Sequence, residues 1–163
     1  MATAISAIPN FDVTQLKNPQ NIRVGIVTAQ WNIDITGPME QGALGVLEKA
    51  GLIPENIRAA SVPGSYELPV AARWMLESGC DAVVCIGCLI KGDTPHFEFI
   101  SESVAKGLMD LNLQFGKPVI FAVITTLTHE QALDRAGGKL GNKGAEGAEA
   151  ALHMVQLKQQ LLP

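Results

Sequence analysis

Residues 81–90 read DAVVCIGCLI, a nearly uninterrupted apolar run of strand length. The run ends at the loop KGDTPH, residues 91–96, where glycine and proline interrupt regular structure. A continuous apolar run rich in valine and isoleucine is typical of a strand that is buried on both faces of a parallel sheet. Because parallel strands need long crossover connections, usually helices, this run predicts an α/β protein.

Three further segments that are expected to be strands lie on either side of this segment, and helical patterns separate them. The expected strands cover residues 22–29 (IRVGIVTA), 57–62 and 119–126 (VIFAVITT). The expected helices cover residues 39–50, after the start signals Thr36 and Pro38, and residues 68–78, 97–115, 128–136 and 142–161. Strands that alternate with helices predict a flavodoxin-like three-layer α/β sandwich, a four-stranded parallel sheet with helices on both faces.

The chain contains no linker, internal repeat or low-complexity tract, so residues 1–163 are expected to form a single domain. Residues 1–20 lack clear periodicity and contain two prolines, which predicts an extended N-terminal arm. Met75, Met109 and Met154 fall on apolar faces of expected helices, so they are expected to fill the core.

The composition excludes several classes of protein. Hydrophobic residues make up 47% of the sequence and charged residues only 17%, which argues against disorder and suggests that further copies cover part of the surface. The formal net charge of −4, without a basic cluster, argues against a nucleic-acid partner. No apolar run approaches membrane-spanning length and no secretory signal opens the chain, so no membrane partner is expected. Three cysteines without a framework spacing favour a cytoplasmic location.

Ligands of such sheets bind beyond the carboxyl ends of the strands, so the loops there are candidates for a site. Trp31 follows the first strand, where its flat face suits stacking on a heterocycle, although an isolated aromatic is as often part of the core. Glu67 lies in VPGSYELP after the second strand. Its carboxylate either complements the dipole of the next helix or accepts hydrogen bonds from ligand hydroxyls.

The loop after the third strand carries residues suited to binding an anion and moving a proton. Asp93 and Thr94 are N-cap types, and Pro95 suits the first position of a helix that begins near His96. The start of a helix favours anions. Because histidine titrates near neutral pH, His96 is a candidate proton carrier, although a lone histidine is more often structural.

Basic side chains surround a glycine-rich stretch, GGKLG, near the end of the chain. Arg135, Lys139 and Lys143 either bind a phosphate or lie on a solvated face, and the stretch matches neither a P-loop nor a dinucleotide fingerprint.

The remaining cysteines and histidines predict no metal site. Cys85 and Cys88 form a C-x-x-C pattern, but residues three apart on a strand point to opposite faces. His129 and His153 have no companions in the sequence and are expected on helix surfaces.

Five segments together resemble the lumazine synthase family over residues 22–161. They are VGIVTAQWN, VPGSYELP, GCLIKGDTPHFEF, PVIFAVITT and DRAGGKLGNKGAEGA, in this order. The resemblance implies a flavodoxin-like fold and a transferase that condenses 5-amino-6-(D-ribitylamino)uracil with 3,4-dihydroxy-2-butanone 4-phosphate. The implied product is 6,7-dimethyl-8-ribityllumazine, formed in the penultimate step of riboflavin biosynthesis.

The resemblance also implies roles for particular residues on the uracil side of the site. Trp31 matches the aromatic that stacks on the uracil ring, and His96 matches the proton carrier. The segment that holds the ribityl chain is matched by Ser65, Tyr66 and Glu67. The strand end that lines the pyrimidine pocket through backbone groups is matched by Cys88, Leu89 and Ile90.

On the phosphate side, Asp93 and Thr94 match the loop that binds the sugar phosphate, and Arg135 matches the phosphate-binding arginine. Phe121 matches an aromatic from the neighbouring subunit, which implies a site at an interface. Lys143 and Glu146 match positions near the site, and the implied role of Glu146 is to orient His96.

Two residues depart from the family's usual pattern. Trp31 stands where a phenylalanine is common, a change that preserves stacking. Asp93 stands where a small neutral residue is common, and its carboxylate would repel phosphate unless it caps the helix and points away. The side chain of Asp93 is therefore not expected to be the ligand.

The implied condensation needs no cofactor, and positioning of the amine and the ketone is expected to contribute more than acid–base catalysis. Two alternatives are a non-catalytic flavin- or lumazine-binding protein and a purely structural shell protein. The presence of His96 and Arg135 favours the enzyme. The implied partners are the two small-molecule substrates and other copies of the chain, as a homopentamer or a multiple of pentamers. The choice among pentamer, decamer and icosahedral shell stays open.

Overall fold

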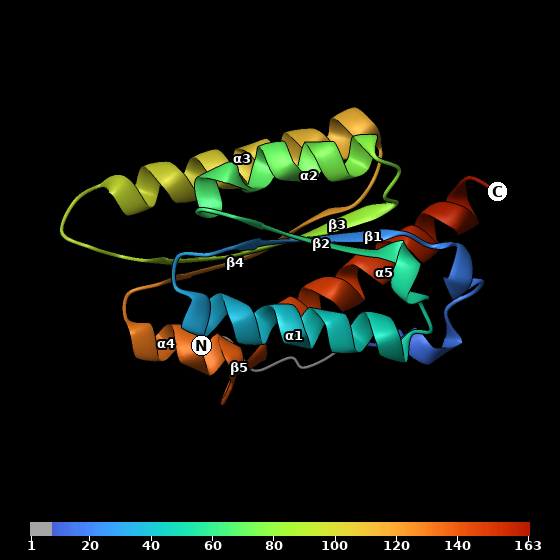
Figure 1. Ribbon diagram of the computed structural model, residues 1–163, viewed down its shortest axis with the longest axis horizontal. Coiled ribbons are helices and arrows are strands. Elements are labelled where there is room, and N and C mark those ends of the chain that lie inside the picture. The colour runs from blue at the N-terminus through green and yellow to red at the C-terminus, as the bar shows by residue number, and fades with distance from the viewer. Residues whose placement is uncertain (1–7) are drawn as a thin grey trace.

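The computed structural model describes residues 8–163, and its centre is a four-stranded parallel sheet (Figure 1). The strands lie in the spatial order β2-β1-β3-β4, with β1 at Val24–Ala29, β2 at Ile57–Val62, β3 at Ala82–Ile90 and β4 at Val119–Thr126. All pairings in this sheet are parallel. The apolar run at residues 81–90 therefore forms an interior strand, β3, as its burial requires.

Helices cover both faces of the sheet, which confirms the predicted three-layer α/β sandwich. They are α1 (Ile33–Lys49), α2 (Leu68–Glu77), α3 (His96–Phe115), α4 (His129–Arg135) and α5 (Lys143–Leu161). Figure 1 shows α2 and α3 on one side of the sheet, and α1, α4 and α5 on the other. Alternate residues of β3 serve the two layers: Val84 and Ile86 join the core under α1 and α5, and Val83 joins the core under α2 and α3.

Helix α1 begins earlier than the sequence predicted. The start signals Thr36 and Pro38 both lie inside the helix, which follows directly from Asn32, an N-cap with a left-handed backbone at φ 59°. The buried Thr36 hydroxyl donates to the carbonyl oxygen of Ala29 at 2.8 Å. This bond ties the first turn to the end of β1, so the helix starts beside the strand despite the proline.

Two other segments differ from the prediction. The glycine-rich stretch between α4 and α5 forms a small antiparallel ribbon of β5 (Ala136–Gly138) and β6 (Gly141–Asn142). In the described part of the predicted arm, Val13–Gln15 and Pro19–Asn21 form 3-10 turns rather than extended chain, because buried Val13 and Leu16 pack on the core. Residues 1–7 of the predicted arm lie outside the described residues.

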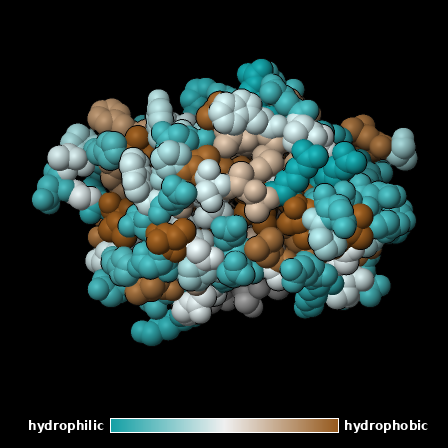
Figure 2. Space-filling model, viewed as in Figure 1, coloured by the Kyte–Doolittle hydropathy of each residue, from teal (hydrophilic) through white to brown (hydrophobic). Residues whose placement is uncertain are grey.

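Large apolar side chains remain exposed on the single chain, and Figure 2 shows apolar surface in several places on one face. Met109 and Met154 are 59% and 44% exposed, so the prediction that they fill the core is wrong for the isolated chain, and only Met75 packs against a core cluster. No helix within residues 8–163 is long and apolar enough to cross a membrane.

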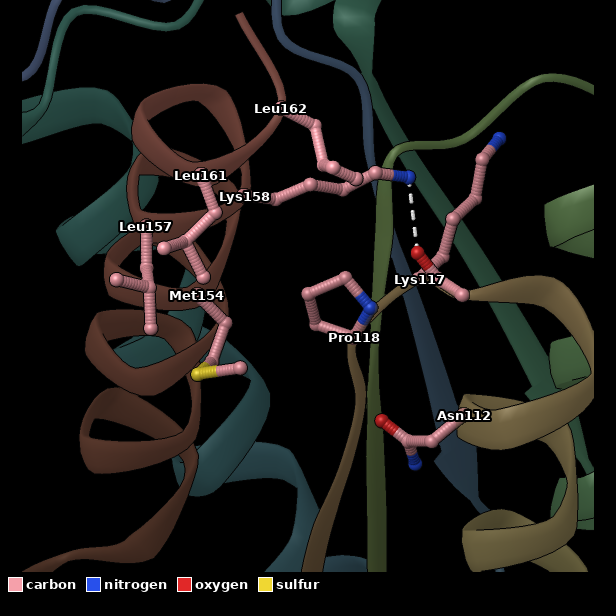
Figure 3. A pocket seen from close by; sticks show the side chains of 9 residues that line it. Asn112, Lys117, Pro118, Met154, Leu157, Lys158, Leu161 and Leu162 are labelled. Atoms are coloured by element: carbon pink, nitrogen blue, oxygen red, sulfur yellow. Dashed lines mark hydrogen bonds between the residues drawn. The ribbon is translucent and has the colours of Figure 1, made fainter.

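An apolar groove lies at the end of the sheet where β4 begins (Figure 3). The side chains of Met154, Leu157 and Leu161 line it from α5, facing Pro118, and Lys158 donates across it to the carbonyl oxygen of Gly116 at 2.8 Å. None of the predicted site residues lines this groove.

Candidate functional site

Trp31 is placed by an extension of the β1–β2 pairing beyond the strands. The backbone N–H of Gln30 donates to Val62 at 2.8 Å, and that of Trp31 donates to Pro63 at 3.1 Å. The indole lies over Gly64, where a Cβ atom would come within 2.4 Å of Trp31 Cε3. Because glycine leaves room for the ring and the side chain is 67% exposed, Trp31 presents an open aromatic face rather than a core contact.

Glu67 and Ser65 belong to a 3-10 turn, Ser65–Glu67, that precedes α2. Glu67 accepts a hydrogen bond from the Gly64 N–H through Oε2 at 3.0 Å, which uses one of its two carboxylate oxygens. The Ser65 hydroxyl is buried and has no hydrogen-bond partner among the described residues. The Glu67 carboxylate and the Trp31 ring both lie beside Gly64, so a polyol next to the ring can donate a hydrogen bond to this carboxylate.

At the end of β3, the backbone N–H and C=O groups on the side toward β1 have no strand partner. Pairing with β1 stops at Thr28 and Ile86, whereas pairing with β4 continues to Ile90 and Thr126. The Asn32 side-chain amide donates to the carbonyl oxygen of Cys88 at 3.2 Å in place of a strand partner. No role was predicted for Asn32 from the sequence, although this residue directly follows Trp31.

These segments meet in one pocket of about 340 Å³, here named the aromatic pocket, which is within the usual size range of ligand sites. It is lined by Trp31, Asn32, Ser65, Tyr66, Glu67, Cys88, Leu89, Ile90, His96 and Ile100. The structure therefore brings together all the residues that the sequence assigned to the uracil side. Ile100 was missed because nothing in its sequence context separates it from the other apolar residues of α3.

The loop between β3 and α3 carries Asp93 and Thr94, both exposed. Contrary to the sequence prediction, neither side chain caps α3: Pro95 is the N-cap residue, and it has no side-chain capping hydrogen bond. The N–H groups of the first turn therefore keep their attraction for an anion. Lys91 and Glu98 bridge the loop at 2.6 Å, and the hydrogen bond from Lys91 holds the pKa of Glu98 below its ordinary value.

Arg135 lines a different cavity of about 430 Å³, here named the cation cavity, at the end of β4. Its lining residues are Val123, Ile124, Thr125, Thr126, Gln131, Arg135, Leu140 and Lys143. Phe121, in the middle of β4, is partly buried against the core under α2 and α3 and lines neither cavity. Within one chain, Arg135 and Phe121 are therefore not brought into the aromatic pocket.

Glu146 does not orient His96 within the chain, in contrast to the role expected from the resemblance. Its Oε2 atom lies 3.3 Å from Lys143 Nζ and 3.5 Å from Arg135 Nη2. The carboxylate is therefore part of the cation cavity's surroundings rather than of the aromatic pocket.

The cysteines lie as the strand geometry predicted. Cys85 and Cys88 belong to the cores on opposite faces of the sheet, and burial raises the pKa of Cys88 to about 11. No cluster of metal-ligating side chains occurs among residues 8–163. His129 is exposed as predicted but has a companion, since its Nε2 lies 2.6 Å from Asp34 Oδ2. His153 stacks on Phe11, with ring centroids 4.8 Å apart.

Comparisons with known proteins agree with this geometry. Residues 21–159 match the family model described as 6,7-dimethyl-8-ribityllumazine synthase. A protein of that name from Phocaeicola vulgatus is 45% identical over 162 residues, which cover 99% of this chain and 96% of the relative. The protein of that name from Cytophaga hutchinsonii is 52% identical over 132 residues, covering 80% and 83%. The one from Flavobacterium psychrophilum is 44% identical over 161 residues, covering 98% and 85%.

The match extends from the strand that precedes Trp31 to the last turns of α5, and it includes every segment that lines the two cavities. The chain belongs to the lumazine synthase family.

Proposed function

We propose that the protein condenses 5-amino-6-(D-ribitylamino)uracil with 3,4-dihydroxy-2-butanone 4-phosphate to give 6,7-dimethyl-8-ribityllumazine. The observation that carries the proposal is the aromatic pocket, where Trp31, Glu67 and His96 meet at the carboxyl edge of the sheet. The amine attacks the ketone to give an imine, phosphate leaves, and ring closure completes the product. Imine formation and ring closure each release one water molecule.

The aromatic pocket binds the uracil substrate. Trp31 stacks on its ring, and the open backbone edge near Ile90 pairs with the polar atoms of the ring. The ribityl hydroxyls bond to Glu67 and Ser65. His96, in the first turn of α3, moves protons to and from the reacting amine and carbonyl.

The sugar phosphate binds through Arg135 and through the backbone amides near Thr94 at the start of α3. Arginine presents a planar fork that meets two phosphate oxygens, and the helix start favours the same charge. Because Arg135 lines the cation cavity and His96 lines the aromatic pocket, a neighbouring subunit completes the site. Phe121 of the neighbour contributes an aromatic contact there.

The active form is a homopentamer or a multiple of pentamers. Trp74, Phe99 and Leu113 support an assembly, because they are large apolar side chains that stay exposed on the single chain. The protein acts in the cytoplasm, a location supported by its cysteines, which are all free.

The test is to incubate both substrates with the purified protein and to follow lumazine absorbance and fluorescence. A rate above the uncatalysed condensation is expected, with a lower rate for the His96→Ala variant purified in the same way. Binding of lumazine without any turnover would instead assign the protein to the non-catalytic binders. Assembly without either binding or turnover would indicate a structural shell protein.

A further inference from the structure

Arg135 and Lys143 are brought together by the ribbon between α4 and α5. Arg135 is the last residue of α4 and Lys143 the first of α5, and β5 pairs with β6 between them. Asn142 fixes the start of α5, because its Oδ1 accepts from the N–H groups of Gly144 and Ala145 at 3.0 Å each. Arg135 and Lys143 thus reach the cation cavity from two helices, and the short β5–β6 ribbon fixes the ends of these helices relative to each other.

A single carboxylate joins these two cations. Glu146, one turn into α5, places Oε2 at 3.3 Å from Lys143 Nζ and 3.5 Å from Arg135 Nη2. The side chains of Arg135, Lys143 and Glu146 are 24%, 35% and 19% exposed, so solvent screens these contacts less than those of a surface pair. The other terminal nitrogen of Arg135, Nη1, donates to the carbonyl oxygen of Leu140 at 3.2 Å. One hydrogen bond and one ion-pair contact therefore hold the guanidinium group of Arg135.

Glu146 itself stays behind the cations. It does not line the cation cavity, whereas Arg135 and Lys143 both do. Its second oxygen, Oε1, is buried without a hydrogen-bond partner among the described residues. A Cβ atom on Gly141 would lie 3.4 Å from Oε1, and the φ of Gly141 is +82°, a backbone that favours glycine. This position lets Glu146 act on the cations without contacting a ligand in the cavity.

The charges explain why a carboxylate is useful there. Arg135 and Lys143 carry two positive charges that repel each other across a small cavity, and Glu146 reduces the sum to one. Without Glu146, the long side chains of Arg135 and Lys143 would move apart toward solvent and would no longer point into the cavity together. With Glu146, they stay preorganised for a doubly charged phosphate group.

We propose that Glu146 is a positioning residue that holds Arg135 and Lys143 in the geometry with which they bind the phosphate of the four-carbon substrate. The proposal rests on the phosphate role of Arg135 given under Proposed function. It differs from an orienting role on His96, because the contacts of Glu146 are with the two cations.

The first test is Glu146→Gln in the assembled enzyme, with each substrate varied in turn. Because the substitution removes the negative charge that contacts both cations, the KM for the sugar phosphate is expected to rise about tenfold or more. The dissociation constant of the ribitylaminouracil should stay within about twofold of wild type, since it binds the aromatic pocket. Glu149→Gln, on the same helix, is the control and should change neither constant. If Glu146→Gln left the sugar-phosphate KM at the wild-type value, the proposal would be wrong.

A double-mutant cycle separates positioning from a general effect on folding. Arg135→Ala alone should raise the sugar-phosphate KM, and adding Glu146→Gln to it should raise KM much less than Glu146→Gln does alone. Equal effects of Glu146→Gln in both backgrounds would overturn the positioning role. If Arg135→Ala left KM unchanged, the phosphate role of Arg135 would fail first, which distinguishes the two failures. Should Glu146→Gln not fold, Glu146→Asp keeps the charge but shortens the reach, and the same cycle applies with an intermediate rise.

Discussion

The aromatic pocket and the cation cavity lie at the same edge of the sheet and have similar volumes, about 340 Å³ and 430 Å³. They differ in what lines them. The first combines apolar walls with one carboxylate and one imidazole, whereas the second combines two cations with threonine hydroxyls and an amide. A single chain therefore carries two cavities that differ in their polar groups, and the proposed function assigns one substrate to each.

The two cavities also differ in whether a single chain brings all their predicted site residues together. Every residue assigned to the uracil side meets in the aromatic pocket of a single chain, whereas Arg135 and Phe121 lie elsewhere. In the proposed ring of identical subunits, each head-to-tail contact would place the cation cavity of one chain against the aromatic pocket of the next. The comparison thus predicts that the two halves can be inactivated on different chains without losing the whole activity.

The largest expected effect comes from mixing two impaired variants and assaying them at a sugar-phosphate concentration well below the KM of Arg135→Ala. One carries Trp31→Ala with His96→Ala and lacks the aromatic pocket's function, and the other carries Arg135→Ala. After mixing at equal amounts, unfolding and reassembly, about a quarter of the head-to-tail contacts regain two intact halves, so about a quarter of the wild-type activity should return. The measurement is the rate of lumazine formation before and after reassembly. Activity no greater than the sum of the two variants would place both halves in one chain.

The next largest effect is expected in the aromatic pocket alone. Trp31→Ala should weaken binding of the ribitylaminouracil by about 1–3 kcal/mol, the scale of stacking a base on an aromatic ring. Trp31→Phe should cost much less, because it keeps an aromatic face. Calorimetric titration with the uracil substrate gives both values, and the KM for the sugar phosphate serves as an internal control. Equal losses for alanine and phenylalanine would show that packing of the indole over Gly64, rather than stacking, is what matters.

A smaller effect is expected for His96, the proposed proton carrier. His96→Ala should lower kcat by less than about a hundredfold, below the usual range for general acid–base catalysis, because amine and ketone already react in water. The dissociation constant of the uracil substrate should change little. Stopped-flow measurement of the chemical step over about pH 6 to 8 tests the role. A pH profile that is identical in wild type and His96→Ala would exclude His96 as the proton carrier.

The sequence predicted the aromatic half better than the cation half for a physical reason. Trp31, Glu67 and His96 each follow a strand of the parallel sheet, and parallel strands align their carboxyl ends, so order along the chain specifies proximity. Arg135 lies beyond α4, and no strand periodicity places it relative to the sheet edge. Its position relative to His96 depends on tertiary packing, which leaves no local pattern in the sequence.

The same distinction applies to the fold. The buried strands were predicted because continuous apolar runs identify them, whereas the start of α1 was not, since the Thr36 hydroxyl bonds to a strand carbonyl that no local pattern reveals. The 3-10 turn at Val13–Gln15 was missed for a related reason: it depends on Val13 packing against distant helices. Met109 and Met154 were assigned to the core because amphipathic patterns do not distinguish a face that meets the core from one that meets another subunit.

The smallest expected effect concerns the loop between β3 and α3. Lys91 and Glu98 bridge this loop at 2.6 Å, and the hydrogen bond from Lys91, followed by one from the backbone of Glu98, lowers the pKa of Glu98. A carboxyl whose pKa is lower in the folded state than in the unfolded state stabilises the fold at pH values above the unfolded pKa. That stabilisation is lost as the pH falls through the folded pKa.

Because the pair is exposed, the effect on Tm should be small at neutral pH. Thermal melts from about pH 7 down to about pH 3 should therefore show Glu98→Gln slightly less stable than wild type above about pH 5, with the difference shrinking below the ordinary glutamate range near pH 4. Glu102→Gln, one turn further along α3, provides the matched control for removing an exposed carboxylate. A difference between Glu98→Gln and wild type that stayed constant across this range would show that the Lys91–Glu98 pair contributes nothing to holding the loop.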